Sequence, residues 1–297
     1  MAAPFSRISI LGTGLIGGSF ALAARAALPE VRVTGWDKPE IAERARALGI
    51  VHDACADLKQ AVSGAELIYV AVPIGVAIER LPEIARYAPP GSLITDASST
   101  KRAICAAAEK CCMNGVNFLG GHPMAGSEVS GIEGADASLF RGAKYALIGS
   151  AVAPVEDART GSEKEASLRA NFVSLLEKIG ARPIWMDAAT HDRAAAFVSH
   201  LPQLAAIALA SVAREATDQT GLPLTLAGRG MRDALRLAGS PYSVWRDIVL
   251  TNTDNLDAAL DRLAQAIEHL RAHLRQRELE EEFAAANDVY KVLRNLQ

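Results

Sequence analysis

The feature that most constrains how this 297-residue chain can fold is a glycine loop close to its N-terminus. The short apolar run from Arg7 to Leu11 leads directly into the loop, and an alanine- and leucine-rich segment at 19–27 follows it. This order predicts a strand, a tight turn and a helix. The loop residues are Gly12, Thr13, Gly14, Leu15, Ile16 and Gly17.

Each glycine of the loop has a physical role in this setting. Gly12 permits the tight turn, Gly14 lets the backbone approach a diphosphate, and Gly17 lets the helix pack closely on the strand. The start of the helix offers backbone N–H groups and the positive end of its dipole to the phosphates. A tight turn without a ligand is the alternative, but the position at the first strand-to-helix turn favours a dinucleotide site.

An acidic residue at the end of the second expected strand indicates which dinucleotide binds. Asp37 lies twenty residues after Gly17. A carboxylate there accepts hydrogen bonds from the adenosine ribose and repels a 2′-phosphate, which favours NAD over NADP. The neighbouring cation Lys38 leaves NADP open. We expect Val72 and Pro73, which follow the third expected strand, to line the cofactor cleft.

The order of apolar runs predicts two domains. Up to residue 187 these runs alternate with helical segments, which is typical of a parallel sheet covered by helices on both faces. Beyond it the chain is helix-rich. We expect a Rossmann-like α/β domain at 1–187 and an all-helical domain at 188–297. Strands are expected at 7–11, 31–36, 67–72, 92–95, 117–119, 145–148 and 183–186, and helices at 19–27, 41–48, 167–179, 190–217 and 222–238.

The composition argues against several classes of function. The net charge is −3 with no basic block, so nucleic acid binding has no electrostatic support. The four cysteines form no CxxC pair and are not spaced from histidines as zinc ligands are, so we expect reduced structural thiols and no metal. No secretory signal is recognisable, and the apolar segment 20–28 is too short to span a bilayer. A soluble, cytoplasmic protein without membrane contact is expected.

Two polar segments at the ends of expected strands contain groups suited to catalysis. Residues 95–101 read TDASSTK, at the strand edge where parallel sheets bind ligands, although Ser and Thr there also serve as helix caps. Residues 120–128 read GGHPMAGSE and predict a rigid, exposed turn at His122. A histidine at such a position is suited to proton transfer near neutral pH.

Two further segments lie in the helix-rich part. Residues 199–203 read SHLPQ, where the proline could equally mark a helix kink. Residues 228–247 contain four arginines. Arg232 and Arg236 share one face if the segment is helical, and two guanidinium groups there would grip carboxylates. A solvated charged face is the alternative.

These motifs together resemble the prephenate/arogenate dehydrogenase family of tyrosine biosynthesis. GLIGGS, TDASSTK, GGHPMAGSEVSG, SHLPQ and GMRDALRLAG…WRDI occur in the family's order between about residues 8 and 252. The resemblance implies a Rossmann-like N-terminal domain, a helical C-terminal dimerisation domain and oxidative decarboxylation of a cyclohexadienol. We favour prephenate as the substrate and NAD as the cofactor, and keep arogenate, dual specificity and NADP open.

The resemblance also implies roles for individual residues. His122 matches the catalytic histidine that accepts a hydrogen bond from the substrate ring hydroxyl, and Ser99 matches a serine that orients this hydroxyl and the nicotinamide. His200 and Arg236 match substrate-binding positions, with the arginine facing a carboxylate. Further residues expected to shape the pocket are Ser127, Glu128, Asp233 and Trp245.

Two other functions fit parts of the pattern. A β-hydroxy acid dehydrogenase of similar build would place a lysine on a helix as its acid–base group, but residues 190–217 contain none. A non-catalytic NAD-sensing module would need the glycine loop without His122, Ser99 or the arginine cluster.

A leucine-rich stripe near the C-terminus bears on assembly. Its members repeat at spacings of four and three, which places them on one side of a helix. They are Leu256, Leu260, Leu263, Ile267, Leu270 and Leu274. The stripe packs either on the core of its own domain or on a second subunit, and we expect a homodimer through the helical domain.

Overall fold

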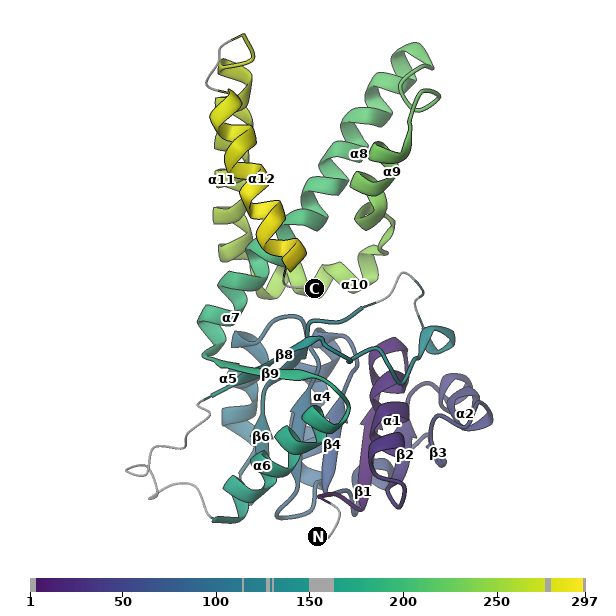
Figure 1. The fold of residues 1–297 in the computed structure, drawn as a ribbon. Coiled ribbons are helices and arrows are strands. Elements are labelled where there is room, and N and C mark those ends of the chain that lie inside the picture. Colours follow the sequence, from purple (N-terminus) through teal and green to yellow (C-terminus); the bar gives the residue numbers. More distant parts are fainter. Residues whose placement is uncertain are drawn as a thin grey trace. The chain divides into compact units, whose positions relative to one another are not determined.

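A computed structural model describes residues 4–113, 115–126, 129, 131–149, 163–275 and 279–295. Its internal contacts divide the chain into two compact units, drawn together in Figure 1. The N-terminal unit comprises Met1–Ala195 and Ser240–Asn252, and the helical unit comprises Ala196–Gly239 and Thr253–Gln297. The chain therefore passes between the units three times.

The N-terminal unit is built around a six-stranded parallel sheet with the order β3-β2-β1-β4-β5-β6 (Figure 1). The strand order reverses beside β1, and the carboxyl ends of β1 and β4 flank the crevice where ligands bind in sheets of this kind. The expected Rossmann-like fold is confirmed. The strands are β1 Arg7–Leu11, β2 Arg32–Trp36, β3 Asp53–Cys55, β4 Leu67–Val70, β5 Leu93–Asp96 and β6 Asn117–Leu119.

Helices cover both faces of this sheet because side chains alternate along each strand. In β4, Leu67 and Tyr69 enter a hydrophobic cluster with α1 and α6, whereas Ile68 and Val70 enter a second cluster with α3, α4 and α5. The continuous apolar run of β4 is thus explained by burial on both sides. The α-helices of the described chain up to residue 178 are α1 Leu15–Ala27, α2 Pro39–Ala47, α3 Leu58–Val62, α4 Ile74–Tyr87, α5 Arg102–Cys111 and α6 Glu163–Lys178.

A second, smaller sheet contains β7 Gly121–Pro123, β8 Lys144–Ile148 and β9 Arg182–Met186. β7 pairs with β8 antiparallel, and β8 pairs with β9 parallel. The expected strands at 145–148 and 183–186 are confirmed, but they lie outside the main sheet. β3 and β7 were not predicted, because residues 53–55 and 121–123 contain no run of large apolar side chains. A 3₁₀ turn, η1 Ile132–Gly134, precedes β8.

The rest of the chain is helical, as expected. Two of its helices belong to the N-terminal unit, α7 Ala188–Ala195 and α10 Tyr242–Thr251. The helical unit contains the π-helix η3 Ala196–His200, α8 Leu201–Thr220, α9 Arg229–Leu235, the 3₁₀ turn η4 Arg236–Gly239, α11 Thr253–Ala272 and α12 Leu279–Asn295. The irregular turn η3 lies directly before Pro202, where the sequence left a kink open.

The expectation of one helix over 222–238 is wrong. The α-helix begins only at Arg229 and gives way to a 3₁₀ turn at Arg236. Gly228 and Gly230 weaken the start of such a helix, and Gly239 weakens its end. Arg232 and Arg236 therefore do not lie on one regular α-helix.

Many large apolar side chains of the helical unit are exposed. Of the leucine-rich stripe, Leu256 is buried, whereas Ile267 is 53% and Leu274 68% exposed. The helical stretch Ala188–Gln219 is also long and apolar enough to cross a membrane by length and composition, a test that core helices of soluble proteins pass as well.

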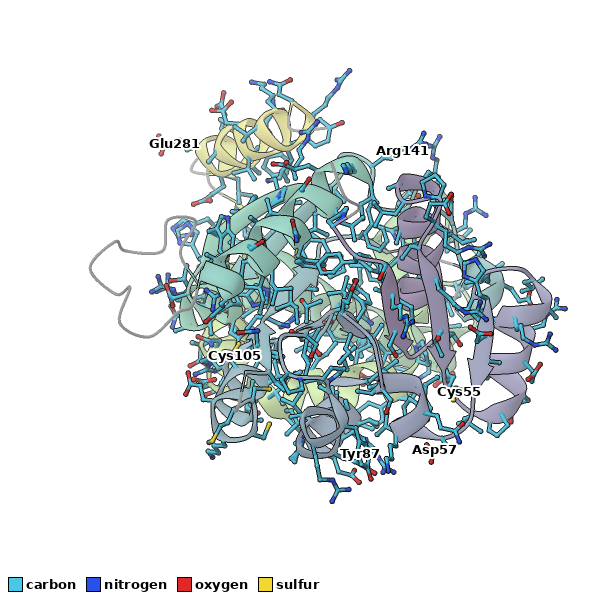
Figure 2. All side chains as sticks on the ribbon, turned by 90° about the horizontal axis from the view of Figure 1, so that it is seen from below. Cys55, Asp57, Tyr87, Cys105, Arg141 and Glu281 are labelled. Carbon is cyan, nitrogen blue, oxygen red and sulfur yellow. The ribbon has the colours of Figure 1, made fainter. Side chains whose placement is uncertain are left out.

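All four cysteines are free thiols. Figure 2 shows Cys55 and Cys105 well apart, and they belong to β3 and α5 respectively. Burial raises the pKa of Cys105 and of Cys112 to about 12. Both thiols therefore stay protonated and poorly nucleophilic near neutral pH, which is consistent with structural thiols.

Candidate active site

The glycine loop has the local geometry that a dinucleotide diphosphate requires. Gly12 has a φ of 95°, and a side chain there would meet the backbone of Ala71 at 2.7 Å. A Cβ at Gly17 would lie 1.9 Å from the Gly12 carbonyl oxygen, because α1 packs directly on the turn. A Cβ at Gly14, in contrast, has nothing within 4 Å. Gly12 and Gly17 therefore pack against the protein, whereas Gly14 leaves space for the phosphates.

Asp37 is held against this loop. Its Oδ2 atom accepts a 2.7 Å hydrogen bond from the Thr13 backbone N–H, and its Oδ1 atom accepts one of 2.8 Å from the Lys38 N–H. The carboxylate therefore has a defined orientation at the end of β2. Val72 and Pro73 follow β4, the neighbour of β1 in the sheet, and Pro73 is the N-cap of α4.

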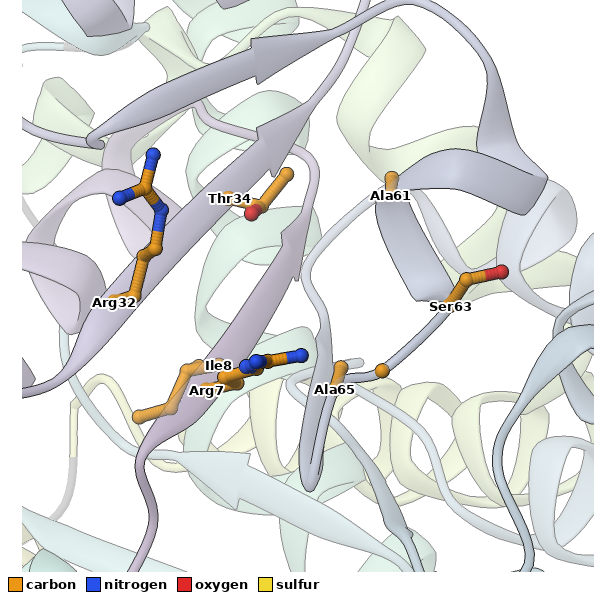
Figure 3. A pocket seen from close by; sticks show the side chains of 8 residues that line it. Arg7, Ile8, Arg32, Thr34, Ala61, Ser63 and Ala65 are labelled. Atoms are coloured by element: carbon orange, nitrogen blue, oxygen red, sulfur yellow. The ribbon is translucent and has the colours of Figure 1, made fainter.

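A second hollow lies at the opposite edge of the sheet. It is lined by residues at the amino ends of the strands, among them Arg7, Arg32 and Thr34 (Figure 3). Its cavity volume is about 40 Å³, room for a few water molecules and too small for a nucleotide. We expect the dinucleotide at the carboxyl edge because the glycine loop lies there.

The expectation of an exposed turn at His122 is wrong: the residue lies in strand β7 and is largely buried, with 8% of its surface exposed. Its Nδ1 atom is 2.9 Å from Nε2 of His191, and Nδ1 of His191 is 2.8 Å from Oδ1 of Asp192. His191 and Asp192 both belong to α7 and are buried. A hydrogen-bonded chain of two imidazoles and one carboxylate thus ends at the histidine that the sequence identified.

Asp192 is held as a carboxylate by several donors. Burial by itself raises its pKa, but hydrogen bonds from His191 and from the backbone N–H groups of Arg102 and Lys101 outweigh burial, so the pKa is lowered. The two backbone bonds are 2.9 and 2.6 Å long. These N–H groups begin α5, whose dipole also favours a negative charge there.

A buried ion pair fixes the backbone on the other side of His122. Lys101 Nζ donates to Asp96 Oδ2 and, at 2.6 Å, to the carbonyl oxygen of Gly121. Asp96 Oδ1 accepts the Gly121 N–H at 3.0 Å. A Cβ at Gly121 would lie 2.8 Å from the Asp96 carbonyl oxygen, so only glycine fits. Both peptide groups of Gly121 are clamped directly before His122.

Ser99 lies in the loop between β5 and α5 and is half-buried. The loop is ordered by its neighbours: Asp96 Oδ2 accepts the Ser98 N–H at 3.0 Å, and Thr100 Oγ1 is 2.7 Å from Thr251 Oγ1. The end of β5 therefore brings Ser99 to the same strand edge as His122. Their roles stay predictions.

The segment around Trp245 is anchored to the N-terminal unit. Trp245 lies in α10, and the nearby Asp247 accepts the Gly75 N–H at the start of α4 at 3.2 Å. A Cβ at Gly75 would lie 2.4 Å from Asp247 Oδ2. The hydrogen bond from Arg246 to Asp247, partly opposed by burial, lowers the pKa of the Asp247 carboxyl.

The remaining predicted substrate-binding residues lie in the helical unit or outside the described residues. His200 ends η3 and is buried. Arg232 and Asp233 lie in α9 and Arg236 begins η4, and all three are exposed. Ser127 and Glu128 lie outside the described residues.

Sequence reasoning missed His191 and Asp192. The signal was weak: both residues stand in a run of four polar residues, 190–193, where exposure is the usual expectation. Lys101 stood at the end of the TDASSTK segment without a role of its own, because nothing in its sequence context predicts full burial.

Comparison with known proteins covers most of the chain. Residues 20–182 match the family profile described as the nucleotide-binding domain of prephenate dehydrogenase. Residues 187–286 match the profile described as its dimerization domain.

Individual relatives agree with these profiles. A prephenate dehydrogenase of Lactococcus lactis subsp. cremoris is 35% identical over 89% of this chain and 74% of its own length. A cyclohexadienyl dehydrogenase of Zymomonas mobilis is 31% identical over 90% of this chain and 88% of its own. The crystal structure of the prephenate dehydrogenase of A. aeolicus with hydroxyphenyl propionate and NAD+ is 27% identical, with a TM-score of 0.80 and 97% of each chain covered.

Proposed function

Because the chain belongs to the prephenate dehydrogenase family, we propose that it oxidatively decarboxylates prephenate to 4-hydroxyphenylpyruvate with reduction of NAD, a step of tyrosine biosynthesis. The observation that carries this proposal is His122, a buried imidazole with a defined hydrogen-bond partner, at the strand edge that also carries the open glycine loop.

The N-terminal unit fits NAD. The open side of Gly14 accommodates the diphosphate and the start of α1 faces it, while Asp37 is oriented to accept hydrogen bonds from the adenosine ribose. Val72 and Pro73 line the same crevice. NAD+ bound there supplies the hydride acceptor. The fixed carboxylate of Asp37 disfavours the 2′-phosphate of NADP.

The residues of the N-terminal unit account for the proton chemistry. His122 accepts the proton of the ring hydroxyl as a hydride leaves the carbon that bears it, so a ketone-like oxygen forms without free acid or base. Ser99 orients the hydroxyl. Loss of CO2 from the opposite ring carbon then restores aromaticity, which drives the reaction forward.

The remaining predicted residues hold the substrate. Arg236 faces a carboxylate, in the bidentate manner that guanidinium groups favour, and His200 contributes a polar contact. Ser127, Glu128, Arg232, Asp233 and Trp245 are the further substrate-binding residues in this proposal. The cyclohexadienyl dehydrogenase relative supports testing arogenate beside prephenate.

We assign the dinucleotide-binding domain to residues 1–187 and the substrate-binding and dimerisation domain to 188–297, and the profile bounds support this division. A homodimer is supported by the exposed apolar stripe of α11 and by the name of the second profile. A membrane location is disfavoured, because Ala188–Gln219 begins with α7, whose carboxylate Asp192 is hydrogen-bonded inside the N-terminal unit. We infer a cytoplasmic enzyme.

The test is a steady-state assay that follows NADH or NADPH absorbance with each combination of prephenate or arogenate and NAD+ or NADP+. The proposal expects the highest kcat/KM with prephenate and NAD+. A higher value with arogenate would replace the substrate, and the absence of reduction with either substrate would favour a non-catalytic NAD-binding protein.

A further inference from the structure

The buried chain from His122 through His191 to Asp192 is more than a packing arrangement. All three side chains are at least nine-tenths buried, and the two links measure 2.9 and 2.8 Å. A buried polar group without a partner is costly, so each link in this chain restricts where the protons of the next ring can be.

The proton positions follow from the carboxylate end. The Asp192 carboxylate accepts hydrogen bonds from the backbone N–H groups of Lys101 and Arg102 at the start of α5. The Arg102 side chain donates a third hydrogen bond to it, 3.3 Å long. An ionised carboxylate only accepts hydrogen bonds, so the link to Nδ1 of His191 requires a proton on that nitrogen.

The tautomer of each ring then follows in turn. A neutral His191 that carries its proton on Nδ1 has a lone pair on Nε2. The link to His122 therefore requires the proton of His122 to be on Nδ1. In neutral His122 the basic lone pair is then on Nε2, and this atom accepts the substrate proton.

The backbone of α7 is also held in place. Asn252 Nδ2 donates a 2.8 Å hydrogen bond to the Asp192 carbonyl oxygen. On the other side, Asp96 and Lys101 hold the Gly121 peptide groups directly before His122. Asn252 thus fixes the backbone that carries His191, and Asp96 and Lys101 fix the backbone that carries His122.

Resting on the proposed function, we propose that His191, oriented by Asp192, is a positioning residue that keeps the proton of His122 on Nδ1 and so makes Nε2 the catalytic base. When His122 takes up the substrate proton on Nε2, its positive charge is shared through His191 with the carboxylate of Asp192. No bond to carbon is made or broken in this step, and one proton moves from the substrate hydroxyl to His122.

His191 is a better test position than Asp192, because Asp192 also binds the first N–H groups of α5 and its loss would disturb that helix. Two substitutions of His191 distinguish its hydrogen bond to His122 from its hydrogen bond to Asp192. In His191→Gln the amide reaches the position of Nε2 and can accept from His122. In His191→Asn the amide reaches only the position of Nδ1, so it can donate to Asp192 but not contact His122.

We expect the two variants to differ in kcat. His191→Asn lowers kcat by about 10- to 100-fold with KM for prephenate nearly unchanged, and His191→Gln restores kcat to within about fivefold of the wild-type value. His52→Asn is the matched control, because Nδ1 of His52 accepts the Val33 N–H far along the chain from the site and an asparagine oxygen can replace it. Equal losses in His191→Asn and His191→Gln would overturn the proposal.

A second measurement does not depend on turnover. Nitrogen-15 NMR of labelled histidines in the protein with NAD+ and without substrate reports which ring nitrogen is protonated. The proposal expects His122 protonated on Nδ1 in the wild type and a mixture of tautomers in His191→Asn. A wild-type His122 protonated on Nε2 at neutral pH would overturn it. If no cyclohexadienol is oxidised, the proposed function fails, while this spectrum still decides the tautomer.

Discussion

The two units of this protein differ in how far their large apolar side chains are buried. In the N-terminal unit, apolar residues fill two clusters, and the buried charges Asp96, Lys101 and Asp192 have partners within the unit. In the helical unit, large apolar side chains such as Val212 and Phe283 are 64% and 74% exposed. The first unit has a core of its own, whereas the second leaves large apolar side chains exposed, as interaction surfaces do.

This difference separates the proposed tasks. A unit with a packed core and paired buried charges can hold a base and a cofactor within the small tolerances that catalysis requires. A unit with exposed apolar helix faces is suited to assembly. Substitutions in the first unit should therefore change kcat, folding or cofactor binding, and substitutions in the second should change assembly or the KM for the substrate.

The largest effect is expected at His122. In His122→Asn, kcat falls by on the order of 100-fold or more, because an amide cannot take up the hydroxyl proton, while substrate affinity is retained. Steady-state kinetics with prephenate and NAD+ measures both quantities. Turnover close to the wild-type value would show that the base lies elsewhere.

The glycine loop offers a matched pair of substitutions. Gly17→Ala places a Cβ 1.9 Å from the Gly12 oxygen and should cost about 2–3 kcal/mol of unfolding free energy through overpacking. Gly14→Ala meets nothing within 4 Å of its Cβ, so it should leave the melting temperature unchanged but raise KM for NAD+. Denaturant titration and kinetics on both proteins test this. The loop assignment fails if Gly14→Ala binds NAD+ as the wild type does.

Dimerisation should be weakened by a substitution in the helical unit and not by one in the N-terminal unit. Ile267→Glu puts a charge on the exposed stripe of α11 and should raise the dimer dissociation constant by about 10- to 100-fold. Met113→Glu is the control, since Met113 is similarly exposed but belongs to the N-terminal unit. Sedimentation velocity over a concentration series distinguishes them. Equal association of both variants would place the subunit contact away from this stripe.

Arg236 should act on binding and not on chemistry. Arg236→Ala is expected to raise KM for prephenate by about tenfold while kcat changes little, because a uniformly held carboxylate contributes to both ground and transition states. Arg229→Ala removes an arginine whose Nε lies 3.7 Å from Asp233 Oδ2, and serves as the control for charge. An unchanged KM in Arg236→Ala would remove the anchoring role.

The smallest effect concerns the contact of α10 with α4. Asp247→Asn should lower the unfolding free energy by about 1 kcal/mol at neutral pH, because a charged acceptor is lost. The pKa of Asp247 is lowered in the folded state, so this contribution is present above about pH 4, the unfolded value, and disappears as pH falls through the folded pKa. Denaturant titrations of both proteins at several pH values measure it. A difference independent of pH would point to packing instead.

Much of this structure was predictable because it depends on local pattern. The glycine loop and five of the six strands of the main sheet follow from short-range order, whereas β3 and the burial of His122 in β7 do not. The second sheet was not predictable, because β7 pairs with β8 across more than twenty residues and shows no periodicity of its own. His191 was missed for the same reason: its significance depends on a contact with His122, 69 positions away, that no local pattern shows.

The three crossings of the chain between the units have a consequence for how the protein can be divided. A fragment that stops at residue 187 would lack Asp247, which binds the first turn of α4, and Asp192, which accepts the first backbone N–H groups of α5. A gene truncation at the apparent domain boundary would thus yield a Rossmann-like fragment with an unfinished interior. Protein engineers who wish to exchange the helical part would need to transplant two separate inserts and leave residues 240–252 in place.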